Sequence, residues 1–184
     1  MCGVQEILYT FQAVTPYPAP TILLGSSQIW TATSRGDSDT GTLCWALGNA
    51  RSGDTITFGP ADFSPRKPVT ISLKNTLPYL SQDSLTIDAS NAGVVLDGSN
   101  TPPGMHGLVM TSKYNMIQGL QISNFPGTGI GIAAGSYNTI GGDRRRGNGP
   151  SGGGNTISGN KTVGIGISRS ITGIISDIST KREG

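Results

Sequence analysis

Short runs of alternating apolar and polar residues follow one another along most of the chain. This alternation is typical of half-buried β-strands, and the Gly and Asn residues between the runs are typical of tight turns. Strands this short suit the faces of a solenoid better than a sandwich. We expect strands at residues 21–24, 29–32, 54–58, 69–73, 85–88, 94–97, 108–110, 115–122, 130–132, 138–140, 155–158 and 165–167.

Two short sequence motifs recur along the second half of the chain. An Asn-x-Ile phrase begins at Asn115, Asn138 and Asn155, and a Gly-rich phrase occupies residues 107–110, 129–132 and 164–167. A phrase that returns about every 20 residues marks a coil that can bury its apolar side only against its neighbours. The sequence therefore predicts an all-β parallel β-helix of about five coils, in which the three Asn residues stack one coil apart at a turn. The alternative for these residues is a ligand-binding row.

One segment has helical periodicity. Residues 42–51 place Leu43, Ala46, Leu47 and Ala50 on one face, after Thr42 as a capping residue. Because the first coil of a β-helix exposes backbone edges, we expect this helix to cover that N-terminal end.

The chain divides unequally. Residues 1–20 are expected to form a strand-like tail and a Pro-rich linker, and residues 21–184 the β-helix domain. A net charge of +2 does not indicate a partner, and we expect no binding to nucleic acid. No apolar run is long enough to span a membrane. Cys2 and Cys44 could form a disulfide in an oxidising compartment, but their spacing does not argue for one. Cys44 is expected to pack as a small apolar residue.

Residues 41–58 resemble the capping segment of secreted right-handed parallel β-helix proteins. One such group is named for a Cys-Ser-Leu-Arg-Glu-Ala motif, and plant-type pectate lyases carry a related Gly-Thr-Leu-Arg segment. Here Cys44 and Trp45 replace the Arg and Glu, so only the capping role carries over. Residues 154–160 and 163–167 are similar to repeats of the pectate-lyase-like superfamily. The resemblance implies a right-handed parallel β-helix, but the superfamily includes both enzymes and structural proteins.

The acidic residues Asp83, Asp88 and Asp97 are weak catalytic candidates. Paired carboxylates would serve a glycoside hydrolase, and a cluster of three would also suit calcium. Each Asp equally fits the opening of a turn, which needs no function. We therefore expect no catalytic residue, no cofactor and no metal, with calcium as the alternative. His106 has no Ser or Cys motif beside it, so no catalytic triad is predicted.

The segment 141–154 inserts a long Gly-rich loop where neighbouring coils turn tightly. It gathers Arg144, Arg145 and Arg146, which suit carboxylate or phosphate groups. We expect these three residues to bind an anionic partner, such as an acidic polysaccharide, rather than to support the fold; the alternative is a solvated loop.

The fold and these residues favour a non-enzymatic extracellular or cell-surface protein, structural or adhesive, with the periplasm as an alternative location. The competing hypothesis is a polysaccharide lyase or glycoside hydrolase acting on an acidic polysaccharide. We expect head-to-tail self-assembly into a filament, in which the N-terminal tail of one chain adds to the last coil of another. The residues expected in this contact are Ile7, Leu8, Tyr9, Phe11, Ile171, Ile174 and Ile175.

Overall fold

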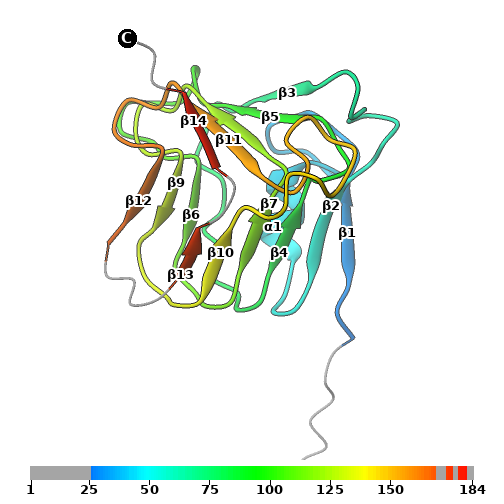
Figure 1. Ribbon diagram of the computed structural model, residues 1–184, viewed down its shortest axis with the longest axis horizontal. Coiled ribbons are helices and arrows are strands. Elements are labelled where there is room, and N and C mark those ends of the chain that lie inside the picture. Colours follow the sequence, from blue (N-terminus) through cyan, green and yellow to red (C-terminus); the bar gives the residue numbers. More distant parts are fainter. Residues whose placement is uncertain (1–25, 169–172, 176–177, 182–184) are drawn as a thin grey trace, which may run out of the picture.

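The computed structural model describes residues 26–168, 173–175 and 178–181, with side chains up to residue 168. Within these ranges the chain winds into an all-β parallel solenoid of about four turns with one short helix near its start (Figure 1). The expected parallel β-helix is confirmed. The number of turns is slightly smaller than the five expected, which does not change the fold.

The described strands form three parallel sheets, named A, B and C in the order in which the chain visits them. Sheet A contains β1 (Ile29–Ala32), β2 (Thr55–Phe58), β4 (Thr86–Asp88), β7 (Met116–Gln118), β10 (Asn138–Ile140) and β13 (Gly173–Ile175). Sheet B contains β3 (Val69–Ser72), β5 (Val94–Asp97), β8 (Gln121–Ser123), β11 (Asn155–Ser158) and β14 (Ile178–Lys181). Sheet C contains β6 (Leu108–Met110), β9 (Ile130–Ile132) and β12 (Ile165–Ile167).

Each turn of the solenoid, which we call a coil, passes through sheets A, B and C in that order. Coil 1 contains β2, β3 and Leu80, which forms a single parallel bridge to Met110. Coils 2, 3 and 4 run from β4 to β6, from β7 to β9 and from β10 to β12, and β13 and β14 continue sheets A and B. The expected period of about 20 residues is wrong. Ile117 pairs with Ile140, and Ile140 with Ile175, so a coil takes 23 residues in one case and 35 in the other.

Residues 115–122, expected to be one strand, are two strands joined by a corner. Gly119 has a φ of +79° and turns the chain from β7 in sheet A to β8 in sheet B. A Cβ atom at this position would collide with the backbone of Ala89 in the coil below. Only glycine combines this backbone conformation with so close an approach.

The expected helix is present as α1 (Leu43–Asn49). The Thr42 side chain accepts a hydrogen bond from the Trp45 N–H at 3.1 Å, which confirms it as the capping residue. Leu43, Ala46 and Leu47 are buried. The helix lies against β1 and β2, behind sheet A in the view of Figure 1. Its buried side chains join the apolar core near the start of the solenoid.

The core is a set of apolar columns that run along the solenoid. In sheet A each inward-facing residue pairs with the equivalent one in the next coil, as Ile56 does with Ile87 and Ile87 with Ile117. Sheet B has a similar column. Both columns are buried, and their members are Ile56, Ile87, Ile117 and Ile140 in sheet A, and Ile71, Leu96, Ile122 and Ile157 in sheet B. Cys44 is half-buried and packs against this core, and burial raises the pKa of its thiol.

A column of buried asparagine side chains stands at the corner where sheet C leads into sheet A. Asn115 Oδ1 accepts the Leu85 N–H at 2.9 Å, and Asn138 Oδ1 accepts the Asn115 N–H at 2.9 Å. Asn155 does not belong to this column as expected. It lies in the same coil as Asn138, at the corner between sheets A and B, where its Oδ1 accepts the Leu120 N–H at 3.0 Å. In each case the acceptor belongs to the residue one coil above the donor.

The same rule extends to both ends of the described solenoid. At the corner between sheets B and C, Asn160 Oδ1 accepts the Phe125 N–H at 2.9 Å. In the first coil the acceptor is Asp54, whose Oδ1 accepts the Gln28 N–H at 2.8 Å. Burial acts to raise the pKa of the Asp54 carboxyl, but the N–H donors of Arg51, Gln28 and Trp30 outweigh it and hold the pKa below its usual range.

Replacing a core isoleucine with aspartate should unfold the coils. Ile140→Asp and Ile157→Asp each place an unpaired carboxylate in the stack, and we expect a loss of about 4 kcal/mol or more in the free energy of unfolding. Thermal melting followed by circular dichroism measures this. Thr139→Asp is the matched control, because Thr139 is a half-buried neighbour on the same strand. An equal loss in the control would contradict the assigned register.

Removing one corner acceptor should cost more than removing an exposed amide. Asn115→Ala leaves the buried Leu85 N–H without its partner, so we expect a loss of about 1–3 kcal/mol. Asn100→Ala removes an exposed hydrogen bond to Ser72 and should change stability by less than about 0.5 kcal/mol. Urea denaturation of both variants compares the two losses. Equal losses in the free energy of unfolding would show that a corner hydrogen bond contributes no more to stability than an exposed one.

Candidate functional site

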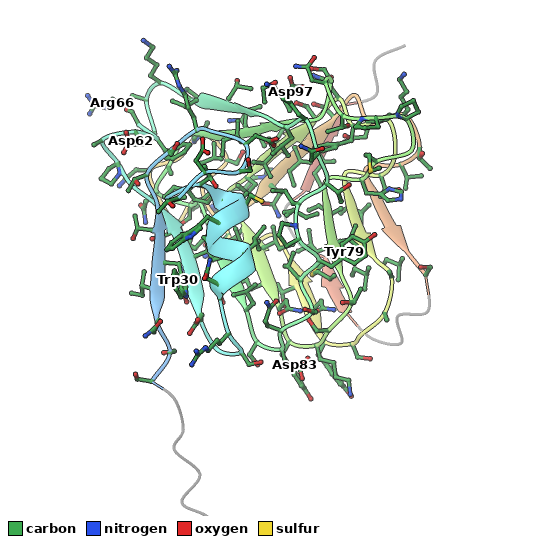
Figure 2. All side chains as sticks on the ribbon, turned by 180° about the vertical axis from the view of Figure 1, so that it is seen from behind. Trp30, Asp62, Arg66, Tyr79, Asp83 and Asp97 are labelled. Atoms are coloured by element: carbon green, nitrogen blue, oxygen red, sulfur yellow. The ribbon has the colours of Figure 1, made fainter. Side chains whose placement is uncertain are left out.

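The three candidate carboxylates lie at separate places on the surface. Asp83 and Asp97 lie at opposite edges of the molecule in Figure 2. Asp83 precedes β4 and its Oδ1 accepts the Lys113 N–H at 2.8 Å. Asp88 ends β4 and accepts the Ser90 N–H at 2.8 Å, which closes a local turn.

Asp97 is also engaged in local hydrogen bonds. Its carboxylate accepts the Ser99 hydroxyl at 2.7 Å and the Asn124 side-chain amide at 2.9 Å. Burial acts to raise the pKa of this carboxyl, but these donors outweigh it and lower the pKa. No group of three His, Cys, Asp or Glu side chains that could hold a metal ion occurs among the described residues. The geometry thus does not join Asp83 with Asp97 into one acid pair.

The Arg-rich loop folds back along the corner between sheets A and B. It leaves β10 in coil 4, passes the short corner of coil 3 and reaches coil 2. There Gly149 N–H donates to the Ser90 carbonyl at 2.8 Å, and Asn148 N–H donates to Asn91 Oδ1 at 3.2 Å. A Cβ atom at Gly149 would lie only 2.5 Å from the Ala92 carbonyl oxygen. The glycines of the loop therefore allow it to pack on the coils below.

The three arginines of this loop differ in their surroundings. Arg144 is half-buried and donates from its guanidinium to the Asn155 carbonyl at 2.8 Å, so it supports the start of β11. Arg146 is exposed, with its Nε 3.8 Å from the Asp143 carboxylate. Arg145 is exposed as well. An anionic partner could therefore approach Arg145 and Arg146 more readily than Arg144.

Alanine replacements should separate these roles. Arg144→Ala removes a charged donor to the backbone, and we expect it to lower the free energy of unfolding by about 1.5–3 kcal/mol. Arg145→Ala and Arg146→Ala remove exposed charges and should each change it by less than about 0.5 kcal/mol. Chemical denaturation of the three single variants tests this. Three equal values would show that Arg144 does not anchor the loop.

A groove of about 270 Å³ lies on the outer side of sheet C. Its floor contains Val109, Gly131 and Gly166, which are aligned in register on β6, β9 and β12. Two of the three floor positions lack a side chain, and this hollows the surface of the sheet. The groove is also lined by His106, Thr128, Ile132, Ala133, Ile167 and Ser168.

His106 stands at one side of this groove in a fixed orientation. Its Nδ1 accepts the Thr128 N–H at 2.9 Å, so in the neutral imidazole Nε2 carries the proton. No Asp, Glu, Lys or Arg lines the groove among the residues that the structure describes. The groove can therefore offer apolar contact, hydroxyl groups and one imidazole donor, but it holds no acid pair.

Sequence reasoning missed the groove. His106 was considered only as a member of a catalytic triad, and its position beside sheet C could not be seen from the sequence. The signal was present in the phrases Gly129–Ile132 and Gly164–Ile167, where glycine stands at the central position of each strand. In Gly107–Met110 the corresponding central residue is Val109, so the glycine occurs in only two of the three strands.

A second missed feature is a pair of stacked tyrosines at the corner between sheets C and A. The rings of Tyr114 and Tyr137 are parallel within 6°, and their centroids are 5.1 Å apart. Both residues have left-handed backbone, with φ values of 60° and 59°. Left-handed backbone costs a non-glycine residue about 1–2 kcal/mol, whereas one aromatic pair contributes about 0.5–1.5 kcal/mol. The stack therefore offsets only part of the backbone cost of the two residues.

The residues expected to mediate self-assembly are mostly beyond what the structure describes. Ile7, Leu8, Tyr9, Phe11 and the division at residue 20 lie outside the described ranges, as does Ile171. Ile174 and Ile175 lie on β13, which pairs with β10 in sheet A.

Comparison of the chain with protein-family models, with curated proteins and with solved structures finds no match. In the described residues, no helix has the length and apolar character needed to cross a membrane.

Proposed function

We propose that this chain is a non-enzymatic extracellular β-helix protein with a structural or adhesive role. The observation that carries the proposal is the chemistry of the sheet C groove. It is a surface hollow with an apolar floor, and no carboxylate or amine lines it among the described residues. Such a surface can bind a ligand, but it lacks the acid–base pair that hydrolysis of a glycoside requires.

The engagement of the acids gives independent support. Asp83, Asp88 and Asp97 each accept a hydrogen bond from a backbone N–H or a side chain of the solenoid. These interactions give each residue a structural role that needs no catalytic function. In this structural role, the carboxylates stabilise turns and join neighbouring coils.

The proposal includes the superfamily of the chain and its cellular location. We place the chain in the pectate-lyase-like superfamily, with a capping segment at residues 41–58 similar to that of the secreted group with the Cys-Ser-Leu-Arg-Glu-Ala motif. The position of α1 against β1 and β2 supports a capping role. An extracellular or cell-surface location follows from the same resemblance.

Head-to-tail association is the proposed mode of assembly. Strand β12 has β9 on one side and, among the described strands, no partner on the other. Ile167 on this strand is 53% exposed, and Val163 just before it is 44% exposed. An open strand edge with apolar side chains favours addition of another strand. The N-terminal tail, residues 1–20, is the proposed donor of that strand.

Two measurements on the purified chain test this proposal. Light scattering and electron microscopy at about 100 μM should show species larger than the 19.0 kDa monomer, and deletion of residues 1–20 should abolish them. The chain should also release no product from polygalacturonate.

The control for the second measurement is the triple variant Asp83→Asn, Asp88→Asn, Asp97→Asn. Cleavage by the unaltered chain that disappears in this variant would establish the polysaccharide lyase or hydrolase alternative. A monomer at all concentrations would refute self-assembly.

A further inference from the structure

The corner between sheets C and A repeats one backbone conformation in successive coils. Gly53, Ser84, Tyr114 and Tyr137 stand directly before the inward-facing corner residues of coils 1 to 4, and all have left-handed backbone, with φ between 59° and 87°. Glycine adopts this conformation at the least cost, and Ser84 shows that a small polar residue is also accommodated. Two successive tyrosines at such a position need an explanation beyond the turn itself.

The tyrosines project from the surface rather than into the core. Tyr114 is 57% exposed and Tyr137 is 54% exposed, although their rings cover one another. Stacked in this way, the rings hold each other in place and form a rigid aromatic shelf. A preordered shelf loses little conformational entropy when a ligand binds to it.

The underside of this shelf faces small residues. One coil below Tyr114 the corner position is Ser84, and one coil further down it is Gly53, neither of which carries a ring to continue the stack. Adjacent strands of a sheet lie about 4.8 Å apart, which is close to the spacing of stacked rings. A six-membered ring placed over Ser84 would therefore continue the tyrosine stack by one level.

Polar groups surround this level. The Asp83 carboxylate accepts the Lys113 N–H and is therefore fixed beside the corner, and the Ser84 side chain is exposed next to it. Lys113 contributes one positive charge and Asp83 one negative charge to the same corner, so their charges balance. A site with an aromatic face, hydroxyl-binding groups and balanced charge fits an uncharged ligand with an apolar face and a hydroxyl rim.

We propose that Tyr114 and Tyr137 form a binding platform for a neutral saccharide. One pyranose ring stacks its C–H face on Tyr114, and its hydroxyl groups hydrogen-bond to Asp83 and Ser84. The inference rests on the proposed adhesive function, for which it supplies a ligand class. It differs from a peptide site, in which a guanidinium group would stack on Tyr114 and pair with Asp83.

The experiment is a titration of the full chain with cellohexaose, followed by calorimetry and by saturation-transfer NMR. We expect binding in the millimolar range or tighter, with transfer from tyrosine ring protons to the sugar C–H protons. The double variant Tyr114→Ser, Tyr137→Ser should weaken binding by about tenfold or more. Serine is chosen because Ser84 adopts the same backbone conformation one coil below.

Two controls separate stacking from folding. Tyr114→Phe, Tyr137→Phe keeps both rings and should bind within about threefold of the original chain. Tyr79→Ser removes another exposed tyrosine, which is 54% exposed and has no stacked partner among the described rings, and should leave binding unchanged. Circular dichroism checks that all variants are folded.

Several results would overturn the proposal. They are no binding of cellohexaose at about 10 mM, equal binding by the serine double variant, or binding of N-acetylarginine amide in place of the sugar. Because these measurements do not depend on assembly or on polygalacturonate cleavage, failure of the saccharide site can be told apart from failure of the proposed function.

Discussion

The structure depends on one interaction that recurs at its corners: a side-chain oxygen accepts the backbone N–H of the residue one coil below. Within a strand, hydrogen bonds to the neighbouring strands pair the backbone N–H and C=O groups. The corners interrupt these hydrogen bonds and would leave buried N–H groups without partners. Asn115, Asn138, Asn155 and Asn160 supply the missing acceptors. Each of these oxygens accepts the backbone N–H of one particular residue in the coil below, so the corner bonds also fix which residue lies above which, and with it the register of the apolar columns.

This constraint explains how much of the fold could be predicted. Alternation of apolar and polar residues identified the strands, and Thr42 with its amphipathic segment identified the capping helix. The period was wrong because Asn-x-Ile marks a corner without saying which corner. Asn138 and Asn155 begin strands of different sheets within one coil, so counting between them measured only part of a turn. The residues that lengthen a coil lie in loops, where sequence periodicity carries no information.

The candidate sites show a second limit of prediction from sequence: residues that are close in sequence need not lie close in space. Asp83 and Asp97 are close in sequence, but a solenoid carries the chain around its circumference within a few residues and places them at opposite edges. Arg144 and Arg145 are neighbours in sequence, yet only Arg144 donates to the backbone of β11. The stacked tyrosines were missed because their signal is a backbone angle at a corner. Sequence reasoning could have noticed that Tyr precedes the recurring Asn at both 114 and 137, since the two pairs are identical.

The Arg-rich loop has a consequence for how the solenoid unfolds. Repeat structures are commonly treated as one-dimensional arrays in which each unit interacts only with the next, so the ends fray one unit at a time. Here Asn148 and Gly149 of coil 4 hydrogen-bond to Asn91 and Ser90 of coil 2 and bypass coil 3. This next-nearest-neighbour coupling means that coil 4 cannot detach without also breaking contacts two units away. The middle of the molecule is thereby joined into one cooperative block, whose amide hydrogens would exchange together rather than coil by coil.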